Sequence, residues 1–142
     1  MSGICNRLVF KNFLKPNSLI KKIILFLYIA LITTMSILPA SDIPKLKTFP
    51  YFDKMVHIIM YAGLSYLMLW NLSENSSKRK YLGTFCFVFG WGFLMEIIQG
   101  ISNMGRSFEL IDIIANTSGI ILGFITWVFL TKYVKRKYIN FH

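Results

Sequence analysis

The sequence predicts an all-α membrane protein, a bundle of four transmembrane helices with both termini in the cytoplasm. Hydrophobic residues make up 55% of the 142-residue chain and charged residues only 15%, which is a more apolar balance than that of soluble domains. The apolar residues gather in four blocks, each close to the ~17–25 residues that a helix needs to cross a bilayer. A soluble domain of this length could bury one such block, but not four. The basic residues alternate between the connections, and this alternation predicts the orientation.

The four blocks follow one another over short connections and form one transmembrane domain, residues 23–131. We expect the spans at 23–39, 54–72, 81–99 and 110–131. Residues 1–22 form a basic cytoplasmic or interfacial segment, in which "RLVFKNFLKPNSLIKK" mixes apolar and basic residues as interfacial helices do. Residues 132–142 form a basic cytoplasmic tail.

The first block also has a feature of secretory signals, because Lys21 and Lys22 precede it. Its apolar core is long, however, and "LPAS" at 38–41 is a poor match to a cleavage site. We therefore expect the block to be retained as the first span.

The distribution of Lys and Arg predicts which end of each span faces the cytoplasm. Twelve of these residues lie in the N-terminal segment, the connection after the second block and the tail, and four lie on the opposite side. The four are Lys45, Lys47, Lys54 and Arg106. Lys and Arg collect on the cytoplasmic side of membrane proteins, so residues 39–52 and 100–109 are expected outside. The net charge of +10 then reflects topology signals and contacts with anionic membrane lipids, and we expect no nucleic-acid partner.

In this topology, polar residues of three spans meet at the outer end of the bundle. They are Asp53, His57 and Tyr61 in the second span, Glu96 and Gln99 in the third, and Asp112 and Asn116 in the fourth. Within each span the spacing of three or four residues places them on one side of the helix. Polar groups at membrane depth are expected to face the bundle interior. We therefore predict one outward-facing site that contains His57, Glu96, Asp112 and Asn116.

Two glycines extend the stripe of Asn116 along the fourth span. Gly119 and Gly123 stand four residues apart in "GIILG", and small residues at this spacing let a neighbouring helix approach closely. We expect both glycines to face another helix.

Four motifs in this order resemble the VanZ-like family of small bacterial integral membrane proteins. They are "DKMVH" with Tyr61 (53–61), "EIIQ" (96–99), "GR" (105–106) and "DIIANTSGIILG" (112–123), and the similarity covers about residues 23–130. The resemblance implies that the signature positions here are Asp53, Lys54, His57, Glu96, Gln99, Arg106, Asp112 and Asn116. Family members often have proline before the Gly-Arg pair, whereas this chain has Met104, which implies a less rigid loop.

The family takes its name from a protein linked to teicoplanin resistance. The resemblance therefore implies antibiotic resistance and a role at the cell envelope, in the cytoplasmic (inner) membrane of a bacterium, without naming a reaction. It also implies the kind of partner: membrane lipids, together with an envelope precursor or a glycopeptide.

The residues themselves leave open whether the protein is an enzyme. His57 titrates near neutrality, and Glu96, partly buried at the edge of the hydrocarbon, suits proton transfer; these two are the candidate catalytic residues. Lys54 and Arg106 could hold a phosphate or carboxylate at headgroup level. The candidate binding residues are Asp53, Lys54, Tyr61, Gln99, Arg106, Asp112 and Asn116. Neither of the loop residues Ser102 and Ser107 lies in the strained elbow of hydrolase nucleophiles.

Three other interpretations stay open. In the first, the polar groups only join the helix ends, with Asp53 and Asp112 favouring the helix dipoles. In the second, the cluster binds an envelope component without altering it; the inner halves of the spans carry no ionisable residue, which favours a one-sided site over a transporter. In the third, a metal binds, and one histidine among carboxylates suits Mg²⁺ or Mn²⁺ better than Zn²⁺. Because no HxxxH or HExxH spacing occurs, we assign no metal ligands and expect no cofactor.

Overall fold

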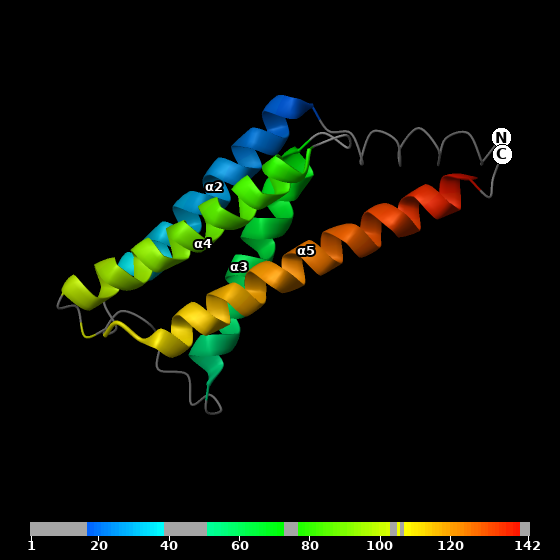
Figure 1. The fold of residues 1–142 in the computed structure, drawn as a ribbon. Helices are drawn as coiled ribbons and strands as arrows, with labels where there is room; N and C mark the ends of the chain where they lie inside the picture. Colours follow the sequence, from blue (N-terminus) through cyan, green and yellow to red (C-terminus); the bar gives the residue numbers. More distant parts are fainter. Residues whose placement is uncertain (1–16, 39–50, 73–76, 103–104, 106, 140–142) are drawn as a thin grey trace.

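The computed structural model describes residues 17–38, 51–72, 77–102, 105 and 107–139, with side chains as far as Tyr133. These residues contain four α-helices: α2 (Ser18–Ile37), α3 (Phe52–Asn71), α4 (Lys78–Ile101) and α5 (Leu110–Ile139) (Figure 1). For the described part of the chain, the prediction of an all-α protein with four helices is confirmed.

Two helices extend beyond the predicted spans. α2 begins at Ser18, inside the segment that we assigned as basic and interfacial, because the Asn17 side chain caps it by accepting a hydrogen bond from the Leu19 amide at 3.3 Å. α5 continues to Ile139, through most of the predicted tail. Residues 132–139 hold no Gly or Pro, and Lys, Arg and Tyr are compatible with a helix interior.

Three of the helices have the length and apolar composition of membrane spans: Ser18–Ile37, Lys78–Ile101 and, within α5, Leu110–Tyr133. α3 has the same length as α2, but its first two turns carry Asp53, Lys54 and His57, which make it more polar. The chain is therefore a membrane protein in which one helix is more polar than the other three.

The polar helix packs against all the others. α3 contacts α2, α4 and α5, and its contact with α5 is the most extensive of any helix pair. The core draws on every helix, with Ile32 from α2, Tyr61 and Leu64 from α3, Val88 from α4 and Ile120 from α5 all buried. Polar side chains on α3 can thus be kept from lipid by its neighbours.

Glycines set the close approach of α5 to α3. A Cβ added at Gly119 would collide with the Ile58 carbonyl oxygen, and one at Gly123 would collide with the Ala62 carbonyl oxygen and the Ser65 hydroxyl. The expectation that both glycines face another helix is confirmed. Beyond the crossing, the C-terminal half of α5 extends past the other helices (Figure 1).

The two ends of the bundle differ in charge. The starts of α2 and α4 lie near the end of α3, while the starts of α3 and α5 lie near the ends of α2 and α4 (Figure 1). The end of the bundle where α2 and α4 start is called the basic end. The basic residues described in the first turns of these two helices are Lys21, Lys22, Lys78, Arg79 and Lys80. We call the opposite end the acidic end, and it carries every acidic side chain that the structure describes: Asp53, Glu96, Glu109 and Asp112.

Candidate functional site

His57 lies at the centre of the polar residues of the acidic end. Its Nδ1 is 2.9 Å from Oδ1 of Asn116 on α5 and 3.6 Å from Oε1 of Glu96 on α4. Because an amide oxygen only accepts, Nδ1 carries the proton and donates to Asn116. One histidine thus links three helices, and Nε2 is the ring nitrogen left for another partner.

Glu96 is the most deeply buried of these groups. Its side chain has no exposed surface, and neither carboxyl oxygen has a hydrogen-bond partner among the described residues. A carboxylate without hydrogen bonds is costly to bury, and buried polar groups normally have partners. The His57 ring and the Asn116 side chain are polar neighbours of this carboxyl group, and Glu96 is positioned to exchange a proton with the ring.

Lys54, in the first turn of α3, is the centre of a second group of polar contacts at the acidic end. Its ammonium forms ion pairs with Asp112 of α5 and with Glu109, the residue before α5, the latter at 2.5 Å, and lies 3.6 Å from Asp53 on its own helix. Asp112 is buried, whereas Asp53 is exposed. Lys54 therefore ties the first turn of α3 to the start of α5, and its charge is already matched by carboxylates.

Two of the predicted residues contact neither His57 nor Lys54 by a hydrogen bond; of these, Tyr61 borders the group around His57, because its ring and the Asn116 amide lie against the same point of Gly92. Gln99 is buried but points to α2, where its Nε2 donates to the Ser36 carbonyl oxygen at 3.2 Å. Tyr61 is buried one turn further into the bundle, and its hydroxyl has no partner among the described residues. Arg106 lies outside the described residues. The structure thus brings together Asp53, Lys54, His57, Glu96, Asp112 and Asn116, and we call these six the polar cluster.

The family model VanZ/LLP1 matches residues 7–131, which is most of the chain. The chain belongs to the VanZ/LLP1 family. No curated protein and no solved structure matches it. The resemblance inferred from the motifs is confirmed. The polar cluster of this VanZ/LLP1 protein contains six of the eight residues that the resemblance suggested as signature positions.

Two residues that help build the cluster of this VanZ/LLP1 protein were missed by sequence reasoning. Glu109, a partner of Lys54, stands three residues before Asp112, and that spacing could have identified it. Gly92 lies one turn before Glu96, and a Cβ there would come within 2.9 Å of the Tyr61 ring and 3.3 Å of the Asn116 amide nitrogen. No local sequence signal distinguishes Gly92 from Gly90, which has open space around it.

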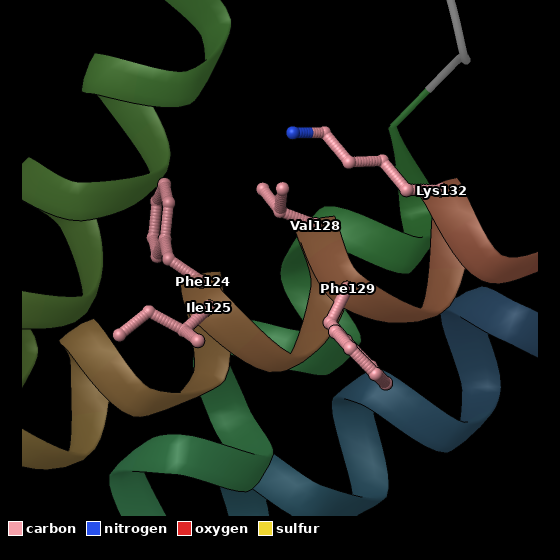
Figure 2. Close-up of a pocket in the computed structure, with 5 residues that line it drawn as sticks. All are labelled: Phe124, Ile125, Val128, Phe129 and Lys132. Atoms are coloured by element: carbon pink, nitrogen blue, oxygen red, sulfur yellow. The ribbon is translucent and has the colours of Figure 1, made fainter.

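The protein also has a groove outside the polar cluster, along the C-terminal half of α5 (Figure 2). It is lined by Phe124, Ile125, Val128, Phe129 and Lys132. Four of these side chains are apolar, and in a membrane such a surface contacts lipid chains. The groove holds no group that could transfer a proton near neutral pH, so the polar cluster is the candidate functional site.

Proposed function

We propose that this VanZ/LLP1 protein binds a component of the bacterial cell envelope through its polar cluster, at the outer face of the cytoplasmic membrane. Through this binding it alters susceptibility to glycopeptide antibiotics. The observation that supports the proposal is the fully buried Glu96 beside His57, with no hydrogen-bond partner among the described residues. One or two polar contacts would suffice to fix helix packing. A buried, unsatisfied carboxyl adds nothing to packing and is typical of functional sites.

The orientation in this proposal follows from the charge of the two ends. The basic end faces the cytoplasm, as the collection of Lys and Arg there favours, and the acidic end faces outward. α3 is then the fourth span, in spite of its polar first turns, because its neighbours enclose it. Both termini are cytoplasmic.

The chemistry that we propose is proton exchange between His57 and Glu96 while the envelope component is bound. Ser102, the residue after α4, donates its hydroxyl to the Gln99 carbonyl oxygen at 3.1 Å, so this hydroxyl is not paired with a base. Proton transfer therefore has more support than covalent catalysis.

An anionic group on the ligand must compete with Glu109 and Asp112 for the Lys54 ammonium. Glu109, whose side chain is 46% exposed, is easier to displace than the buried Asp112. We propose that the anion replaces Glu109 as a partner of Lys54. Arg106, outside the described residues, is the second cation of this proposal.

A packing-only role for the cluster is the alternative, and the ion pair of Lys54 with Asp112, which joins α3 to α5, favours it. Under that alternative the cluster residues affect only folding, so abundance and function would change together in every variant.

Cysteine labelling tests the orientation. In a Cys5→Ser, Cys86→Ser background, a membrane-impermeant maleimide applied to intact cells is expected to label Asn103→Cys and to leave Ser76→Cys unlabelled. Both positions should react after the cells are permeabilised. Labelling of position 76 but not of position 103 in intact cells would show that the orientation is inverted.

Substitution of His57 tests the function. In a teicoplanin-susceptible host, His57→Ala is expected to reach the membrane at wild-type abundance and to lose the change in susceptibility that the wild type causes. Thr126→Ala is the matched control, because Thr126 is exposed on α5 and its hydroxyl donates to the Leu122 carbonyl oxygen of its own helix. The control should retain both properties. If His57→Ala disappears from the membrane, packing is the better account; if the wild type leaves susceptibility unchanged, the glycopeptide role is wrong.

A further inference from the structure

The acidic end carries more negative charge than the cations described there can balance. Four carboxyl groups lie at this end, and the described residues provide one ammonium, from Lys54, and one imidazole, from His57. Carboxylates close together favour the binding of a cation. The arrangement of the ligand atoms shows where a cation fits best.

Asp53, His57 and Asp112 each offer one ligand atom, and these three atoms lie within 4.8 Å of one another. Ligands of one metal ion at about 2.1 Å from it are at most about 4.2 Å apart, so a small movement brings the three into coordination. Asp53 is exposed and free to make that movement. Asp53 and His57 are one turn apart on α3, and Asp112 comes from the first turn of α5.

The surroundings of His57 are a second, independent indication of a metal site. A metal-binding histidine usually donates its other ring N–H to a carboxylate or carbonyl oxygen, which fixes the ring and raises its basicity. Here Nδ1 donates to Asn116 and faces the buried, unpartnered carboxyl of Glu96. Nε2 is therefore the nitrogen available to a metal. Glu96 would then help to orient the metal-binding histidine, which is a role that helix packing does not require.

We propose that Asp53, His57 and Asp112 bind one divalent cation, with Asn116 and Glu96 as the outer partners of the histidine. Two carboxylates and one imidazole suit Mn²⁺, because Mg²⁺ prefers oxygen ligands and structural Zn²⁺ sites are closed by Cys and His. On the side of the exposed Asp53 the ion has room for water or a ligand oxygen.

Lys54 occupies the position that the ion would take between the carboxylates. Its ammonium pairs with Asp112 and lies 3.6 Å from Asp53, so it competes with the metal. Its contact with Glu109 gives it a place to move to. A bound ion would also let this acidic end accept an anionic headgroup; that consequence rests on the proposed function, whereas the metal site does not.

Metal binding by the purified full-length protein tests the proposal. The protein in detergent, freed of metal by a chelator, is titrated with Mn²⁺, and free Mn²⁺ is measured by its electron paramagnetic resonance signal. We expect one Mn²⁺ per chain, and Asp53→Asn is expected to weaken binding at least about tenfold. Lys54→Met should bind more tightly than the wild type, because it lacks the competitor.

Glu109→Gln is the comparison variant. Like Asp53→Asn it removes one negative charge beside Lys54, but Glu109 is not one of the three ligands. Its affinity for Mn²⁺ should change by less than that of Asp53→Asn, because it acts only through the competing Lys54 and through one exposed charge. Absence of stoichiometric binding up to about 1 mM Mn²⁺, the range of very weak sites, would overturn the proposal. Equal losses in Asp53→Asn and Glu109→Gln would also overturn it, because they would indicate diffuse attraction. Circular dichroism verifies that each variant is folded.

Discussion

Lys54→Met is expected to lower the stability of the protein by about 3 kcal/mol in metal-free buffer, because removing one partner of a buried ion pair leaves the other charge uncompensated. Lys54 is mostly buried, and its partner Asp112 is more so, with side chains 17% and 6% exposed. Glu109 and Asp53 lose the same cation. The change should be seen as a lower midpoint of thermal unfolding in detergent.

The double variant Lys54→Met, Asp112→Asn separates charge from packing. It removes the buried carboxylate together with its cation, so most of the lost stability should return, and added Mn²⁺ should stabilise the single variant more than the double. A double variant as unstable as Lys54→Met alone would mean that the lysine acts through its packing and that the ion pair contributes little.

Gly123→Leu is expected to have an effect of similar size, at least about 2 kcal/mol, because excess volume in a tight contact forces the backbones apart. The first atom of the new side chain would meet the Ala62 carbonyl oxygen and the Ser65 hydroxyl. Ser65 is itself buried and donates to the Ile120 carbonyl oxygen at 3.2 Å across the same crossing. Thermal unfolding and the yield of monodisperse protein in detergent both measure the loss.

Leu110→Ala is the control for a size change on the same helix. Leu110 is 68% exposed, so its truncation removes little packing and should cost less than about 0.5 kcal/mol, as surface substitutions usually do. If Gly123→Leu is no less stable than Leu110→Ala, the helices do not meet at Gly123 as described.

Composition and periodicity predicted the four helices and the meeting of His57, Glu96, Asp112 and Asn116, because hydropathy reports the spans and the topology sets their depth. The helix ends were harder to predict. Hydropathy identifies the apolar part of a helix. The helix itself can continue into polar residues, as long as these residues are compatible with helical structure. For this reason α5 runs on to Ile139 through basic residues.

Gln99 shows a different limit. It stands three residues after Glu96, and that spacing predicted a shared direction, yet Gln99 bonds to Ser36 on α2 while Glu96 faces His57 on α3. Three residues leave two side chains about 60° apart around a helix, which is enough to reach different neighbours in a bundle. The pairing of Lys54 with Asp112 was also beyond prediction from the sequence, because it depends on how closely α3 and α5 cross.

In the proposed function the polar cluster acts through the proton of Glu96, and the Glu96→Gln variant shows whether that proton is needed. Glutamine keeps the size and hydrogen-bonding capacity of the side chain but cannot exchange the proton. The measurement is the teicoplanin susceptibility of cells that express the variant, compared with wild type at equal membrane abundance. We expect normal abundance together with loss of the wild-type effect on susceptibility. A Gln variant that is fully active at normal abundance would contradict the account, because Glu96 could then not be the proton-exchanging group.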